Sequence, residues 1–91
     1  MRVSRILRGC SAAKEQLVDV VQMLPLVELL GDRRVLIENH KGVVLYSHDE
    51  IDIKLNIGLL CITGRDLHIA YISGQRLVIN GLIKSITISG K

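Results

Sequence analysis

The first part of the chain carries apolar residues at helical spacing. Between residues 3 and 24 they recur three, four or seven positions apart, and polar side chains fall mostly on the opposite arc. This spacing is typical of an amphipathic helix with a broad apolar face. Pro25 disfavours helical backbone at the residue before it, so we expect the helix to end at Leu24. The pattern therefore predicts an amphipathic helix at residues 1–24.

After Pro25 the apolar period falls from about 3.6 to about 2 residues. The clearest run, Ile51 to Leu55, alternates strictly, which is typical of a strand with one buried face. Turn-forming residues separate the runs, and Asn80-Gly81 is the strongest hairpin signal among them. The predicted strands are 26–30, 33–38, 42–46, 50–56, 59–63, 66–72, 75–80 and 82–88. We therefore expect residues 25–91 to form an all-β domain.

A short motif recurs within this domain. Val43-x-Leu45-x-Ser47 returns as Leu60-x-Ile62-x-Gly64 and as Leu77-x-Ile79-x-Gly81, in steps of 17 positions. The predicted fold class is thus mainly β: a single small domain of short strands in a two-strand repeat, with an N-terminal amphipathic helix. An antiparallel meander curled into a small sandwich or partial barrel would satisfy the repeat, and so would a short β-solenoid. The tight turns favour the meander.

Composition excludes several classes of protein. A chain of 91 residues is one domain, and its only aromatic residues are Tyr46 and Tyr71. A net charge of +3 without stacking aromatics does not indicate nucleic-acid binding. Cys10 and Cys61 lie far apart, so we expect two reduced thiols in a cytosolic protein rather than a disulfide framework or zinc site. No apolar run approaches the roughly 20 residues that cross a bilayer, and a signal peptide is not expected.

The N-terminal helix has a basic start. Its first eight residues include Arg2, Arg5 and Arg8 and no acidic residue, which makes these arginines candidate contacts with an anionic membrane surface. The other interpretation is that the apolar face of the helix packs against the β domain or a second copy.

A second apolar surface is expected on the β domain. Strict alternation would place several apolar side chains on the wet face of the sheet. These residues are Leu59, Cys61, Ala70, Ile72, Val78 and Ile83. We therefore expect the helix to pack on the sheet or the chain to form a homo-oligomer.

No residue pattern indicates a reaction. His40, His48 and His68 lack metal-ligand spacing, and no serine lies in a nucleophile motif. We therefore predict no catalytic, metal-binding or cofactor-binding residues, and a protein that is not an enzyme.

The polar island Asn39-His40-Lys41-Gly42 interrupts two apolar runs. Asparagine and glycine both tolerate left-handed backbone conformations, so the island predicts a structured turn. We expect His40 and Lys41 at its tip, where they are candidates for contact with a partner.

The sequence resembles the YabP/YqfC family of sporulation proteins, and the YqfC branch somewhat more than the YabP branch. The resemblance begins at the Leu24-Pro25 boundary and runs to Ile88. It rests on the segments IENHKGVVLYS at 37–47, IDIKLNIGLLCITGRDLHIAYI at 51–72 and LVINGLIKSITI at 77–88. One departure is the chain end at 89–91, which lacks the closing aromatic residue usual in the family.

The resemblance implies a non-enzymatic protein that an endospore-forming bacterium needs for sporulation. It implies action in the mother cell, in the cytoplasm and at the periphery of the forespore membrane. Family members tend to be encoded beside a membrane protein, YqfD for YqfC, so a YqfD-like partner is expected. Two function classes stay open: an assembly or scaffold module that docks to a membrane protein, and a peripheral membrane-surface binder that uses its arginine-rich helix.

Overall fold

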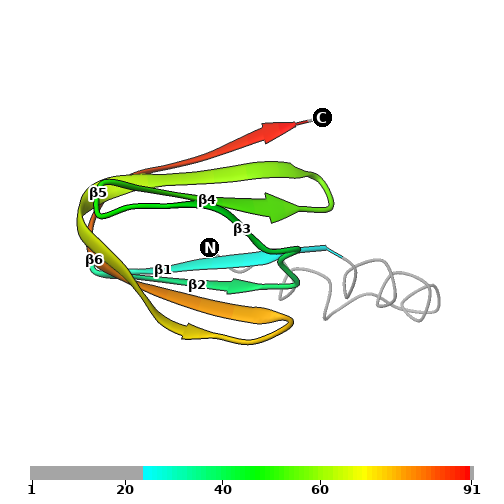
Figure 1. The fold of residues 1–91 in the computed structure, drawn as a ribbon, viewed down its shortest axis with the longest axis horizontal. Helices are drawn as coiled ribbons and strands as arrows, with labels where there is room; N and C mark the ends of the chain where they lie inside the picture. Colours follow the sequence, from blue (N-terminus) through cyan, green and yellow to red (C-terminus); the bar gives the residue numbers. More distant parts are fainter. Residues whose placement is uncertain (1–23, 91) are drawn as a thin grey trace, which may run out of the picture.

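The protein was analysed as a computed structural model that describes residues 24–90. The predicted helix lies outside the described residues apart from Leu24, and so do Arg2, Arg5 and Arg8. Six strands form one sheet in the order β1-β2-β6-β5-β4-β3 (Figure 1). The strands are β1 (Leu26–Leu30), β2 (Arg34–Glu38), β3 (Val43–Tyr46), β4 (Glu50–Leu55), β5 (Gly58–Ile72) and β6 (Arg76–Gly90).

The single sheet folds back on itself to make two layers (Figure 1). β5 and β6 are each 15 residues long and bend in the middle, so that each contributes one half to each layer. The first half of β5 pairs with β4, and β3 follows β4 at the edge of that layer; the first half of β6 pairs with β2, and β1 follows β2 at the edge of the other layer. All described pairings are antiparallel, which agrees with the predicted meander and not with the solenoid. The strand order departs from a simple meander at one point, because β2 pairs with β6 and not with β3.

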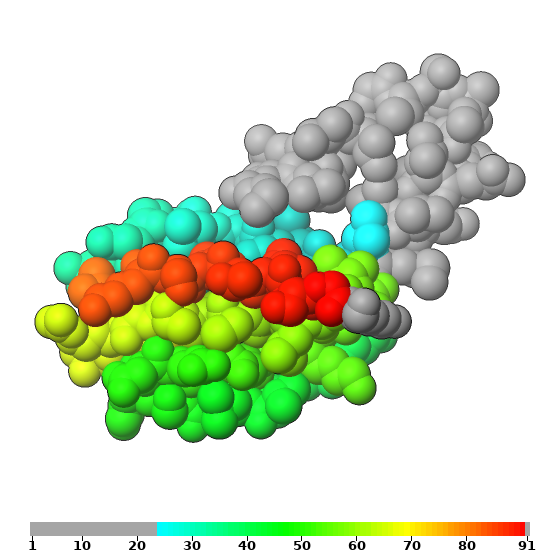
Figure 2. Space-filling model, turned by 90° about the horizontal axis from the view of Figure 1, so that it is seen from above, coloured from blue at the N-terminus to red at the C-terminus, as the bar shows by residue number. Residues whose placement is uncertain are grey.

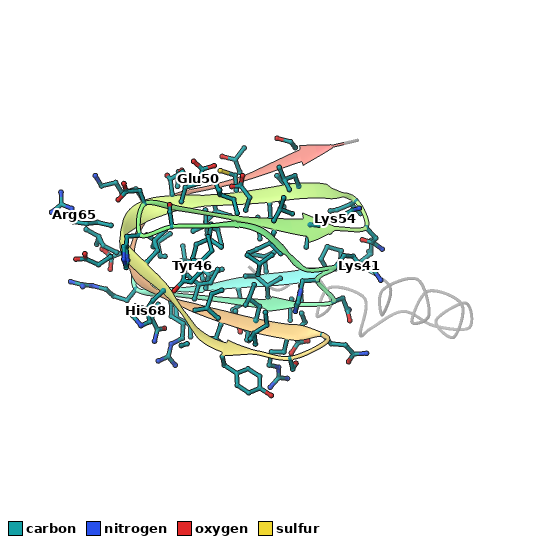
Figure 3. The ribbon with its side chains drawn as sticks, in the orientation of Figure 1. Lys41, Tyr46, Glu50, Lys54, Arg65 and His68 are labelled. Atoms are coloured by element: carbon teal, nitrogen blue, oxygen red, sulfur yellow. The ribbon has the colours of Figure 1, made fainter. Side chains whose placement is uncertain are left out.

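Aliphatic side chains fill the space between the layers. The alternating run in β4 buries Ile51, Ile53 and Leu55, as its period predicts. The other fully or nearly fully buried hydrophobic residues are Val35, Ile37, Leu60, Ile62, Leu67, Leu77, Ile79 and Ile83. Tyr46 points from β3 toward the second half of β5 in the other layer (Figure 3). Its hydroxyl oxygen accepts a hydrogen bond from the backbone N–H of Ile69 at 3.2 Å.

Two predicted turns are wrong, because they are corners inside long strands. The predicted breaks after Thr63 and at Asn80-Gly81 fall where β5 and β6 bend without ending. A Cβ atom on Gly64 would overlap the carbonyl oxygen of Leu82, and one on Gly81, which has φ 140°, would lie 2.7 Å from a backbone oxygen. The two glycines therefore allow two backbones to approach each other closely, and they do not form a hairpin turn.

The corner also changes the expected second surface, as Ile83 shows. Ile83 is 9% exposed and belongs to the core, although strict alternation placed it outside. The register between β5 and β6 shifts at Thr63/Gly64 and again between Arg65 and His68, which changes the face to which later residues point. Val78 does lie on the outer face, because its neighbours Leu77 and Ile79 are buried.

Candidate functional site

The polar island at residues 39–42 connects β2 to β3 and so joins the two layers (Figure 1). Asn39 has φ 66° and Gly42 has φ 124°, which is the left-handed backbone expected for a structured turn. The backbone N–H of Lys41 donates to the carbonyl of Lys54 at 2.7 Å, and the N–H of Lys54 donates to the carbonyl of Gly42 at 2.8 Å. The island thereby pairs with the end of β4.

Asn39 ties the island to two further segments. Its backbone N–H donates to the carbonyl oxygen of Gln75 at 2.7 Å, in the turn between β5 and β6. Its side-chain Nδ2 donates to the carbonyl oxygen of Leu24 at 2.9 Å, just before β1. One asparagine therefore holds the start of the described chain and a distant hairpin at the same end of the sandwich.

His40 is buried and does not lie at an exposed tip. The side chain is 6% exposed, and both ring nitrogens have partners. Nδ1 accepts a hydrogen bond from the N–H of Gly42 at 3.0 Å, so that nitrogen carries no proton. Nε2 then carries the proton and donates to the carbonyl oxygen of Ser73 at 2.9 Å. The prediction that His40 lies at the tip of the turn is therefore wrong, because its imidazole is buried and links two turns. Lys41, its neighbour in the sequence, is exposed.

A cleft of about 700 Å³ opens beside the island. Its lining residues are Asn39, His40, Lys41, Gly42, Asn56, Gly74 and Gln75. Three turns that are distant in sequence therefore meet around it. Lys41 and Lys54 lie at this end of the sandwich, whereas Arg65 and His68 lie at the opposite end, near the corner (Figure 3). Contact of this region with a partner stays a prediction.

An acid–thiol cluster, formed by Glu50, Asp52 and Cys61, lies on the outer face of β4 and β5. Asp52 and Cys61 are opposite each other in register, and the Cys61 thiol donates to Oε2 of Glu50 at 3.3 Å. The ligand atoms of the three residues lie within 4.8 Å of one another. Oδ1 of Asp52 is buried and has no hydrogen-bond partner in the described part of the chain. Ligand spacing in the sequence misses this cluster because strand pairing brings Cys61 to the acids.

The thiol of this cluster is held in its protonated form. Burial first, and then hydrogen bonds to Asp52 and Glu50, raise the pKa of Cys61 to about 12. A thiol of this kind is a poor nucleophile at neutral pH, because the thiolate is the reactive species. A metal ion would have to displace the proton before the sulfur could act as a ligand. The cluster as it stands is a hydrogen-bonded thiol between two carboxylates.

The raised pKa predicts how stability depends on pH. The ordinary pKa of 9.0 applies in the unfolded chain and about 12 in the folded one, so the unfolded thiol loses its proton first as pH rises. The stabilisation is therefore present below pH 9 and is lost toward pH 12. Cys61→Ser keeps a donor but does not titrate in this range. Urea unfolding at increasing pH should show the stability of the wild type falling relative to this variant, and a constant difference would contradict the assignment.

An apolar row crosses the outer face of the other layer. Leu36 in β2 is opposite Val78 in β6, and Val78 is opposite Tyr71 in β5. Leu36 and Val78 are half-buried, and Tyr71 is 53% exposed. We call these three residues the outer row.

Polar pairs flank the outer row on both sides. The Arg76 guanidinium donates to the Glu38 carboxylate at 2.8 Å on one side. On the other side, Nε of Arg34 donates to Oδ1 of Asn80 at 2.9 Å. An apolar centre with a polar rim is the usual composition of a protein–protein contact surface.

Comparison with known proteins identifies the family. Residues 25–91 match the model of the YabP family. The chain is also 30% identical over 82 residues to a Bacillus subtilis (strain 168) protein named "Uncharacterized protein YqfC", a match that covers 90% of this chain and 88% of that protein. The chain belongs to the YabP family.

The family match covers every described strand. In this YabP family chain the island, the acid–thiol cluster and the outer row all lie inside the matched residues. The candidate membrane contacts Arg2, Arg5 and Arg8 precede the family match and lie outside the described residues. Within residues 24–90, no helix is long and apolar enough to cross a membrane.

Proposed function

We propose that this YabP family protein is a non-enzymatic sporulation protein that works as an assembly module in the mother cell. In this proposal it lies in the cytoplasm at the periphery of the forespore membrane and pairs with a membrane protein of the YqfD kind. Membership of the YabP family supports the proposal, as does the similarity to YqfC over nearly the whole chain.

The outer row is the observation that carries this proposal. A solvent-facing sheet surface normally alternates to polar residues, whereas Leu36, Val78 and Tyr71 form a continuous apolar line across three strands. An exposed tyrosine beside half-buried aliphatic residues is typical of the centre of a binding surface. The flanking polar pairs described above would supply its rim.

The polar groups of the sandwich support a role without catalysis. Ser47 and Ser73 use their hydroxyl oxygens to accept backbone N–H groups in their own turns. His40 is occupied by two backbone groups, and Cys61 is kept protonated. In the described residues, the polar groups of these side chains form hydrogen bonds that stabilise the fold.

Substitution in the outer row tests the proposed pairing. Tyr71→Ser should weaken co-purification with a co-expressed YqfD-like membrane protein by roughly tenfold or more, because it removes the aromatic anchor of the surface. Ile57→Ser is the matched control, since Ile57 is 40% exposed and lies in the turn between β4 and β5. Both variants should keep the melting temperature of the wild type. Equal co-purification of Tyr71→Ser, Ile57→Ser and wild type would count against the outer row.

The second candidate function is direct binding to an anionic membrane through Arg2, Arg5 and Arg8. The sequence observation that favours it is that the first eight residues contain these three arginines and no acidic residue. Binding of the full chain to anionic liposomes that falls with salt, and that is lost when the three arginines become glutamines, would support this function. A fluorescent fusion that stays at the forespore membrane in this variant would instead support targeting by a protein partner.

A further inference from the structure

Within residues 24–90, the second half of β6 is an open sheet edge. β6 pairs with β2 only from Arg76 to Asn80, and the last bond on that side runs from the N–H of Ile83 to the carbonyl of Asp32 at 2.7 Å. From residue 84 onward, no described strand lies on that side. Figure 2 shows this arm in red at the surface, beside β5 in yellow-green. On the open side its backbone groups pair with no other strand of the described residues, and such an edge can accept another strand.

The other edges of the sandwich are short or interrupted. β3 has four residues with a register shift, and β1 has five residues and follows Pro25. The second half of β5 contains register shifts, and the Tyr46 hydroxyl already accepts the N–H of Ile69. By contrast, the open part of β6 keeps a regular register with β5 from Ser85 to Gly90 and contains Lys84 as its one charged residue. It lacks the features that usually protect an edge.

The sequence of this edge is self-complementary. Residues 85–89 read Ser-Ile-Thr-Ile-Ser, which is the same in both directions. If two copies pair antiparallel about a two-fold axis at Thr87, threonine faces threonine, each isoleucine faces an isoleucine and each serine faces a serine. A two-fold interface requires this kind of surface, because each residue must suit its own partner. Hydroxyl pairs and β-branched pairs across strands are both stabilising.

The faces of the strand fit the same arrangement. Thr87 lies opposite Cys61 on the outer face and is exposed, so its contact with a second Thr87 would displace no core residue. Ile86 packs partly against the core, while Ile88 is 45% exposed. Pairing would place Ile86 of one copy beside Ile88 of the other and cover that exposed side chain. Lys84 would face Gly90, so the pairing brings no like charges together.

We propose that a second copy of this chain pairs with the open edge of β6 along residues 85–89, so that one sheet layer continues through a two-fold dimer. This inference does not depend on the proposed membrane partner, whose surface, the outer row, lies on the other layer. The self-complementary sequence favours a second copy of this chain over a strand from another protein as the partner of this edge.

The test is the oligomeric state of the full chain. Sedimentation equilibrium over a range of concentrations should show a dimer, and Thr87→Lys should raise its Kd by about tenfold or more, because two like charges then meet at the axis. Val44→Lys is the matched control: Val44 is 61% exposed and lies on β3, at the other edge of the same layer, so its Kd should stay that of the wild type.

Hydrogen exchange then locates the interface. In the wild type and in Val44→Lys, alternate backbone amides of residues 85–89 should become protected as the concentration rises, and in Thr87→Lys they should not. A chain that is monomeric at all concentrations, a dimer that Thr87→Lys leaves intact, or equal loss in both lysine variants would each overturn the proposal. Co-purification with the membrane partner should be unchanged in Thr87→Lys, which separates this test from that of the proposed function.

Discussion

Replacing Gly64 by alanine should remove about 4 kcal/mol or more of stability, which is a large part of what a small domain has. The added methyl group would overlap the carbonyl oxygen of Leu82 and crowd Cδ2 of Leu67 at 3.1 Å. Backbone atoms cannot move aside as the end of a side chain can. Because β5 and β6 belong to both layers, a shift at the corner would disturb the packing of the whole sandwich.

Gly74→Ala is the matched control for this prediction. Gly74 lies in the turn between β5 and β6, and a Cβ atom there would meet nothing within 4 Å. Urea unfolding followed by circular dichroism should give Gly74→Ala a free energy of unfolding within about 0.5 kcal/mol of the wild type. If Gly64→Ala were as stable as Gly74→Ala, the corner would not depend on close approach of the two backbones.

The elements of this fold were largely predictable because alternation depends on neighbouring residues alone. The run from Ile51 to Leu55 alternates strictly, and its apolar members are buried as expected. The turn at the polar island was also predictable, since Asn39 and Gly42 adopt the left-handed backbone that their chemistry permits. Both predictions succeed because the burial pattern of this strand and the backbone conformation of this turn depend on residues that are close in the sequence.

The corner was not predictable in this way. Asn80-Gly81 has the composition of a hairpin turn, yet β6 continues through it. What decides its conformation is the backbone of Asp66 across the sheet, which approaches Gly81 too closely for a side chain. Residues close in the sequence give no information on a contact between positions 66 and 81. The glycines were therefore predicted to lie in turns, which is their commonest role.

The internal repeat has a different meaning in the folded chain. Leu60-x-Ile62-x-Gly64 precedes the corner in β5, and Leu77-x-Ile79-x-Gly81 precedes the corner in β6. The two strands are antiparallel, so the motif performs the same task from opposite directions: two buried aliphatic residues and then a glycine at the bend. The repeat thus marks two related long strands and not stacked coils.

The candidate sites depended on strand pairing that the sequence could not supply. Glu50 and Asp52 share a strand face, but Cys61 joins them only through the register of β4 with β5. Likewise, Leu36 and Tyr71 belong to one surface only because Val78 lies between them in β6. Predicting either group requires the sheet order, in which β2 and β6 are neighbours although they are distant in sequence.

His40→Ala should destabilise the protein by about 2–3 kcal/mol. The substitution removes the donor to the carbonyl oxygen of Ser73 and the acceptor for the N–H of Gly42, and it leaves space where a buried ring was. It should also loosen the contact between the island and the turn that joins β5 to β6. Thermal unfolding and backbone hydrogen exchange would measure both effects.

Lys41→Ala is the control that separates a structural island from a recognition surface. Lys41 is exposed next to His40, so its loss should change stability by less than about 0.5 kcal/mol. If His40→Ala were as stable as Lys41→Ala, the two hydrogen bonds of the imidazole would contribute little to the fold. If instead Lys41→Ala keeps full stability but lowers the yield of heat-resistant spores, the exposed lysine contacts a partner. The buried histidine beside it would then hold the island in the shape which that contact requires.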